Sequence, residues 1–207
     1  IFWYFRKSFL KPSKLRHASL SNKLYKSIFI GTMPIVIIGV IIKLFVPGFS
    51  DSYLRSNLSI GIVSIIMSLV MLYADNSTNK YINLSNHKFR SSFFIGIAQA
   101  FAIIPGVSRS GSTISIALLS GWDRKDAAKI SFLLGIPAIS LAALVEFISS
   151  LNQVSIFPIL PLVVGLITTF LFSLLSIKFL IKYVSSYGLK LFIYYRLIFG
   201  ILIILNL

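Results

Sequence analysis

Five long apolar stretches are the strongest constraint on what this chain can fold into. A transmembrane helix needs about 20 mostly apolar residues to cross the hydrocarbon core of a bilayer. The stretches lie at 27–46, 58–74, 130–149, 156–177 and 191–207. We therefore predict an all-α, polytopic integral membrane protein with about five transmembrane helices, forming a single membrane domain over residues 1–207.

The composition agrees with a membrane setting. Hydrophobic residues make up 57% of the chain and charged residues only 12%, whereas soluble domains carry about 25% charged residues. Cysteine is absent from the sequence, which excludes disulfides and thiolate chemistry within it. The net charge of +15 is typical of nucleic-acid binding in a soluble protein. Here the basic residues lie between the apolar stretches, so they indicate membrane orientation and no nucleic-acid partner.

Loop charges predict one consistent orientation. Lys and Arg accumulate in the cytoplasmic loops of membrane proteins. Sixteen of the 20 Lys and Arg residues fall in four loops, which we place inside the cell: 6–26, 75–91, 122–129 and 178–190. The loops 47–57 and 150–155 carry little or no positive charge and then fall outside.

Two shorter apolar segments, 92–104 and 113–119, surround a polar turn. At about 1.5 Å per helical residue, neither segment is long enough to cross the bilayer. Basic loops flank the pair on both sides, so both of its ends are expected inside. The pattern predicts a re-entrant helix–loop–helix hairpin, whose irregular backbone would be buried in protein or lie beside a wet cavity.

The polar turn combines the groups that favour an anion. Glycines allow a tight turn and the close approach of a ligand, and hydroxyls offer hydrogen bonds. Arg109 supplies a cation with a planar donor fork suited to phosphate. The next helix is expected to begin at about Ser112, with its free N–H groups aimed into the turn. The residues concerned are Gly106, Ser108, Arg109, Ser110, Gly111, Ser112 and Thr113.

Simpler or competing interpretations of the turn fit less well. An ordinary cytoplasmic turn would explain Arg109, but the turn lies far enough from both basic flanks to sit within the bilayer, where arginine is costly and usually functional. A P-loop would need lysine where the chain has Ser112, and a preceding strand. The other lipid-phosphatase signature would need histidine where the chain has Ser115.

The segment 105–113 reads Pro-Gly-Val-Ser-Arg-Ser-Gly-Ser-Thr and resembles the second motif of the bacitracin-resistance undecaprenyl-diphosphate phosphatase family. The similarity extends to the segments 31–34, 96–99 and 131–137 and to the pair Tyr195–Arg196. The resemblance implies a hydrolase of the bacterial plasma membrane that converts a C55 polyprenyl diphosphate to the monophosphate and phosphate. It also implies recycling of the carrier lipid for peptidoglycan synthesis, hence cell-wall biogenesis, cell shape and bacitracin resistance.

The resemblance further implies roles for individual residues. Arg109 would neutralise charge on the diphosphate and on the transition state, while the hydroxyls would orient phosphate oxygens. The expected catalytic residues are Arg109, Ser108, Ser110 and Thr113. The expected substrate-binding residues are Gly106, Gly111, Ser112 and Gln99. Gln99 fits polar packing between membrane helices equally well.

One part of the family pattern has no counterpart in this chain. The first family motif brings a glutamate pair and a histidine, whereas the histidines here are His17 and His87, which we expect to be solvated in cytoplasmic loops. The first residue is Ile1. We therefore expect an N-terminally truncated chain that is inactive alone, has no metal site of its own, and lacks the ligands of a divalent cation (Mg²⁺ or Ca²⁺).

Three further expectations concern single elements. The segment 180–187 is predicted to be a short interfacial helix that ends at Gly188. Trp122 is expected to anchor at the membrane interface. Arg196 lies within the last apolar stretch, where it either snorkels toward the inner interface or braces the hairpin; the resemblance favours bracing.

Two other function classes stay open at this point. A transporter or flippase for a phosphorylated lipid would also use a hairpin with an anion site near the midplane. A non-catalytic membrane scaffold would leave an arginine at membrane depth unexplained. The expected partners are a polyprenyl diphosphate lipid and the bilayer, and a homodimer stays open.

Overall fold

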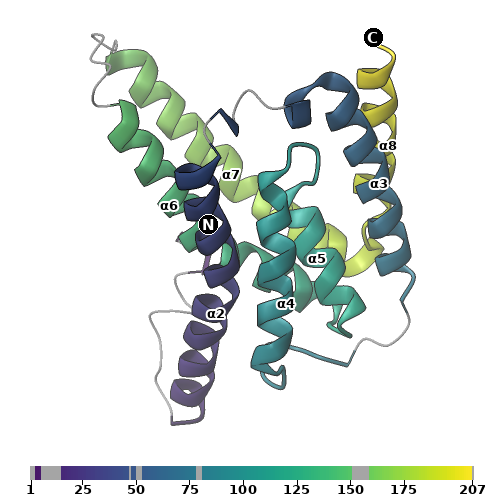
Figure 1. Cartoon of the computed structure of the whole chain (residues 1–207). Coiled ribbons are helices and arrows are strands. Elements are labelled where there is room, and N and C mark those ends of the chain that lie inside the picture. The colour runs from purple at the N-terminus through teal and green to yellow at the C-terminus, as the bar shows by residue number, and fades with distance from the viewer. Residues whose placement is uncertain are drawn as a thin grey trace.

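The chain folds into a bundle of helices, described by a computed structural model over residues 3–5, 15–46, 48–49, 53–77, 81–150 and 159–206. The helices, in chain order, are α2 (Leu15–Phe45), η2 (Tyr53–Arg55), α3 (Asn57–Asp75), α4 (Phe89–Ala100), η3 (Phe101–Ile103), α5 (Arg109–Leu119), α6 (Arg124–Ser150), α7 (Ile159–Tyr187) and α8 (Lys190–Ile204). The described residues form no strand beyond one isolated bridge, which confirms the predicted all-α class (Figure 1).

Four helices are long and apolar enough to span a membrane. They are Asn22–Phe45 within α2, α3, α6 and Leu160–Tyr187 within α7. Their outward faces carry large exposed apolar side chains such as Leu44, Phe172 and Leu175, as expected where lipid is the solvent. These helices match four of the five predicted stretches, although residues 151–158, which include the loop 150–155 almost entirely, lie outside the described part.

The fifth predicted stretch is α8, a helix of 15 residues. At about 1.5 Å per residue it is roughly 22 Å long, shorter than a full crossing of the hydrocarbon core. Figure 1 shows α8 beside α3. The two backbones approach closely because both helices present glycine at the crossing: a Cβ added to Gly61 would lie 2.8 Å from the carbonyl oxygen of Gly200.

The predicted hairpin is formed by α4, η3, a turn and α5, which pack against each other. Its two ends meet, because the amide of Ile82 donates to the carbonyl of Gly121 at 2.9 Å and the amide of Asp123 donates to the carbonyl of Ile82 at 2.9 Å. The chain therefore enters and leaves the hairpin at the same end, as the loop charges predict. Figure 1 shows the hairpin between α2 and α6 on one side and α3 and α8 on the other.

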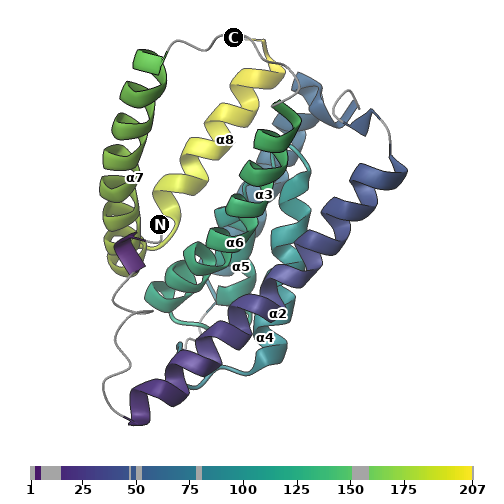
Figure 2. The same cartoon turned by 90° about the vertical axis from the view of Figure 1, so that its left-hand side faces the viewer.

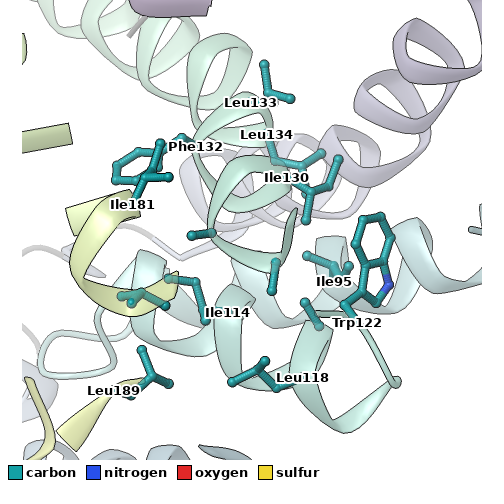
Figure 3. Packing of buried hydrophobic residues seen from close by; sticks show 14 of the residues in the cluster. Ile95, Ile114, Leu118, Trp122, Ile130, Phe132, Leu133, Leu134, Ile181 and Leu189 are labelled. Atoms are coloured by element: carbon teal, nitrogen blue, oxygen red, sulfur yellow. The ribbon is translucent and has the colours of Figure 1, made fainter. Parts of the chain in front are cut away.

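The core of the protein surrounds this hairpin. Ile114 and Leu118 of α5 are almost fully buried among residues of α4, α6 and α7, which include Ile95, Ile130 and Ile181 (Figure 3). Figure 2 shows α2 lying across α4 and α6, while α7 stands at the edge of the bundle. The polar turn is thus held by the best-packed part of the molecule.

Two sequence-based expectations are wrong in this region. The segment 180–187 is not a separate interfacial helix but the end of α7, which continues unbroken to Tyr187 and ends before Gly188 at φ +74°. Within this continuous helix, Ile181 and Val184 face the core, whereas Lys182 faces outward and its charge stays exposed. Trp122 is fully buried and donates from Nε1 to Ser91 Oγ at 2.6 Å, so it anchors the hairpin rather than the interface.

Candidate functional site

The turn before α5 is fixed by Ser108, which caps the helix. The amide of Gly111 donates to Ser108 Oγ at 3.2 Å. Ser108 adopts φ 62° and ψ 110°, a conformation that non-glycine residues rarely occupy and that concentrates at functional sites. The helix begins at Arg109 and not at Ser112 as predicted, because Ser108 rather than a later serine provides the cap.

Gly106 meets two requirements in the same turn. Its φ is +90°, and an added Cβ would lie 2.8 Å from the carbonyl oxygen of Ile60 and 3.1 Å from Cβ of Val63 on α3. Any side chain here would both strain the backbone and push the turn away from α3. The packing of the turn against α3 therefore depends on this glycine.

Arg109 points from the turn toward α4 and α6. Its Nη1 donates to Gln99 Oε1 at 3.1 Å and to the carbonyl oxygen of Ser131 at 3.3 Å. The guanidinium lies against the backbone of Gly135, where an added Cβ would be 2.5 Å from Arg109 Cζ. The structure thus brings together Arg109 and Gln99, and adds Ser131 and Gly135 as supports that sequence reasoning did not place in the site.

Thr113 belongs to the same side of the turn as Arg109. Its hydroxyl lies 2.6 Å from Ser131 Oγ and 2.8 Å from the carbonyl oxygen of Arg109. Thr113 is completely buried, so it holds α5 to α6 beside Arg109. The segment that contains Ser131 and Gly135 stands out in the sequence only by its resemblance, since small residues in an apolar helix give no sign of the partner they face.

Ser108 and Ser110 face a different space. They line a pocket of about 120 Å³ together with Gly111 from the turn and Tyr195 and Arg196 from α8. The remaining lining is apolar and comes from Met71, Ile114, Leu180, Val184, Leu189 and Phe192. Arg109 and Thr113 do not line this pocket. The predicted catalytic residues therefore divide into Ser108 and Ser110 in the pocket and Arg109 and Thr113 on the other side of the turn.

The side chain of Ser112 lies neither in the pocket of Ser108 and Ser110 nor beside the Arg109 guanidinium. Its hydroxyl donates to the carbonyl oxygen of Arg109 at 3.0 Å. Its side chain lines a second pocket of about 280 Å³, which is almost entirely apolar and is walled by α3 and α4 residues such as Met67, Val70 and Phe94. The Ser112 hydroxyl therefore serves the backbone of its own helix in this structure.

Buried polar atoms without a partner lie on either side of the turn. Among the described residues, Gln99 Nε2 and Ser115 Oγ have no hydrogen-bond partner, and Gln99 is fully buried. A buried donor without an acceptor destabilises a protein by about 1–3 kcal/mol. The fixed cation of Arg109 and the free amide of Gln99 are therefore adjacent groups suited to an anionic oxygen.

Comparison with known proteins decides the family. The family model described as bacitracin resistance protein BacA matches residues 1–202. The chain belongs to the BacA family. An undecaprenyl-diphosphatase of Prochlorococcus marinus (strain MIT 9515) is 73% identical over 212 residues, which covers 100% of this chain and 80% of that protein.

More distant BacA relatives match as well. An undecaprenyl-diphosphatase of Prochlorococcus marinus (strain MIT 9312) is 59% identical over 99% of this chain and 78% of its own length. Another, from strain MIT 9313, is 47% identical over 86% of this chain and 60% of its own length. Each match includes most of the helices that build the turn and its pocket.

His87 of this BacA-family chain is not the solvated residue expected from sequence. It is buried at the base of the hairpin, with Nε2 2.6 Å from Ser27 Oγ of α2 and Nδ1 3.0 Å from the carbonyl oxygen of Leu84. Burial, followed by the positive charge of Lys23, lowers the pKa of His87. Sequence reasoning missed this because the burial depends on α2, which is remote in sequence; the side chain of His17 lies outside the described residues.

Asp75 is a second polar residue at the base whose role no sequence motif predicts. Arg124 Nε donates to its Oδ1 at 2.8 Å, and the backbone amide of Leu189 donates to its Oδ2 at 3.1 Å. Gly188 makes room for the carboxylate, since an added Cβ would lie 2.7 Å from Asp75 Oδ1. One carboxylate thus joins the end of α3, the start of α6 and the link between α7 and α8.

The described residues do not fit a metal site. Within the described ranges, no three His, Asp or Glu side chains lie close enough together to hold a metal ion. Asp75 is engaged by Arg124 and Leu189, and His87 by Ser27 and Leu84. The turn of this BacA-family protein offers one cation, hydroxyls and amides, which suit phosphate rather than a divalent cation.

Proposed function

We propose that this protein is an undecaprenyl-diphosphatase, which hydrolyses undecaprenyl diphosphate to undecaprenyl phosphate and inorganic phosphate. The observation that carries the proposal is its 73% identity, over 100% of the chain, to a BacA-family protein of that name. The reaction takes up one water and breaks the bond between the bridging oxygen and the terminal phosphorus. It returns the carrier lipid to cell-wall synthesis and confers resistance to bacitracin.

The chemistry of the turn supports this function. A diphosphate carries several negative charges, and charge shifts to the bridging oxygen as the terminal phosphoryl group leaves. Arg109 is held at the turn by Gln99 and Ser131, so its charge is preorganised and costs little reorganisation in the transition state. Ser108 and Ser110 supply hydroxyls to the neighbouring pocket, and the α5 N-terminus adds its positive dipole end.

The cofactor and cellular location belong to the proposal. A divalent cation, Mg²⁺ or Ca²⁺, would offset the charge of the diphosphate, with ligands that lie outside the described residues. Four apolar helices indicate a membrane protein, and we place it in the bacterial plasma membrane. A flippase or transporter would use the same architecture, but the named relatives favour the enzyme.

The test is phosphate release from undecaprenyl diphosphate by the protein expressed from its complete reading frame and purified in detergent. Replacing Arg109 with alanine is expected to lower kcat/KM by about 100- to 1000-fold, the usual loss on removal of a group that stabilises transition-state charge. Arg55→Ala removes an exposed arginine of the short η2 helix that does not line the pocket, and is the matched control. EDTA is expected to abolish release, and Mg²⁺ or Ca²⁺ to restore it.

A well-folded wild-type protein that binds the lipid but releases no phosphate in any of these conditions would contradict the proposal. Equal activity of the Arg109→Ala and Arg55→Ala variants would remove Arg109 from the site while leaving the enzyme assignment intact.

A further inference from the structure

Arg196 lies in the middle of α8 and is its one charged residue after Lys190 at the helix start. It is the only charged residue among the described residues that line the pocket of Ser108 and Ser110. Ionisable side chains inside membrane helices are costly and usually mark a functional site. The pocket therefore has one charge, which is positive, and two hydroxyls from the turn.

The packing of α8 on α3 positions Arg196 at this pocket. Gly200 lies one helical turn after Arg196 on the same face of α8, and an added Cβ on Gly200 would be 2.9 Å from the carbonyl oxygen of Gly61. Because the two backbones lie close together, the Arg196 side chain can reach the turn. There its Nη2 donates to the carbonyl oxygen of Gly106.

The contact with Gly106 engages only some of the N–H donors of the Arg196 guanidinium. Arginine has five N–H donors. Nη2 is bonded to Gly106, while the buried Nε has no partner among the described residues. No carboxylate within the described ranges forms an ion pair with Arg196. A half-buried cation without a counter-charge and a buried donor without an acceptor both favour an anionic ligand.

We propose that Arg196 is a substrate-contacting residue that binds the diphosphate group in the pocket of Ser108 and Ser110. The contact with Gly106 orients the guanidinium, and its remaining N–H groups face phosphate oxygens. Arg109 acts from the other side of the same turn. The inference rests on the proposed function for the identity of the lipid, but binding of a diphosphate tests it separately.

The experiment uses inorganic pyrophosphate and undecaprenyl diphosphate with the protein expressed from its complete reading frame. The wild type, Arg196→Gln and Arg196→Lys are compared for KM, kcat and the rise in Tm caused by pyrophosphate. We expect at least a tenfold higher KM and no Tm rise for Arg196→Gln. Arg196→Lys should keep the charge but lose the planar fork, and its KM should rise about 3- to 10-fold. Lys190→Gln removes an exposed charge at the start of α8 and is the matched control.

A purely structural brace would give a different pattern. In that case Arg196→Gln would lower Tm, while KM and the response to pyrophosphate would match the wild type, and the proposal would be overturned. If Arg196→Gln does not fold, Arg196→Lys decides, because an unchanged KM with a normal Tm also overturns it. A wild type that binds pyrophosphate through Arg196 but releases no phosphate would refute the proposed function and leave this inference standing.

Discussion

Two arginines approach one short turn from opposite sides. Arg109 is part of the turn and points toward α4 and α6, where Gln99 and the Ser131 carbonyl hold it. Arg196 comes from α8 and donates to the carbonyl of Gly106 within the turn. Both guanidinium groups are thus anchored within the protein, so binding of the proposed diphosphate would cost them little conformational entropy.

A substitution at Gly135 tests the importance of the Arg109 orientation while leaving the arginine itself unchanged. A Cβ at this position would overlap the guanidinium, at 2.5 Å from Cζ, so Gly135→Ala should displace Arg109. We expect kcat/KM for phosphate release to fall about 10- to 100-fold, since a displacement of about 1 Å can have such an effect. Gly165→Ala is the control, because an added Cβ there meets nothing within 4 Å. Equal activity of the two variants would show that Arg109 tolerates the displacement.

His87 predicts a pH dependence of stability. Burial and Lys23 lower its pKa in the folded protein, so below the ordinary histidine pKa of about 6.5 the unfolded state binds more protons. Stability is therefore fully present above pH 6.5 or so and decreases as the pH falls below it, by at most about 1.4 kcal/mol per pH unit. Tm measured from pH 8 to pH 5 should show this decrease. His87→Gln should flatten the profile, and a profile as steep as that of the wild type would exclude His87 as the cause.

At the scale of elements, the base of the hairpin is held by polar contacts rather than by apolar packing alone. The Ile82–Trp122 bridge closes the hairpin, and Asp75 ties α3 to α6 and to the start of α8. The position of α8 in turn sets where Arg196 lies. Asp75 is thus a positioning residue for the pocket, although it does not line it.

Asp75→Asn should loosen this connection. The Asp75 side chain is 1% exposed and that of Arg124 is 32% exposed, so the pair is only partly screened by solvent. We expect a loss of about 2 kcal/mol in unfolding free energy, below the 3–5 kcal/mol of fully buried pairs, together with a higher KM. Lys129→Gln removes one partner of the more exposed Asp126–Lys129 pair and should cost less than about 1 kcal/mol. A similar loss in both variants would contradict the role given to Asp75.

The elements were largely predictable from sequence, whereas several of their contacts were not. Hydropathy and loop charge are local signals, and they predicted the hairpin and five spanning helices. Four of these are long enough to span, and the fifth, α8, is a shorter apolar helix. The start of α5 was placed too late because Ser108 caps it from a rare backbone conformation. The division of the turn into an Arg109 side and an Arg196 side depends on the close helix crossings at Gly135 and Gly200, which no local pattern encodes.

At the scale of the whole molecule, the hairpin makes a prediction about topology. Ser85 and Lys125 are exposed residues at the two ends of the hairpin, and the bridge places these ends together. Tyr53 is 95% exposed in the loop after α2 and is predicted to lie on the other side of the membrane. Single cysteine substitutions at these positions should be labelled by an impermeant thiol reagent accordingly. Ser85→Cys and Lys125→Cys should react only from the cytoplasmic side, and Tyr53→Cys only from outside.

Labelling of Ser85→Cys and Lys125→Cys from opposite faces would mean that α4 and α5 cross the membrane as one broken span. The loop-charge orientation would then be wrong as well, since it places both flanks of the hairpin inside.

The contact between Arg196 and Gly106 has a consequence for biogenesis. Chains are synthesised from the N-terminus, so the turn leaves the ribosome well before α8. Until α8 arrives, the carbonyl of Gly106 lacks its arginine and Asp75 lacks the amide of Leu189. The pocket is therefore completed only once α8 has been synthesised. A nascent protein therefore makes α3 and the hairpin before it acquires the arginine that we propose binds the diphosphate.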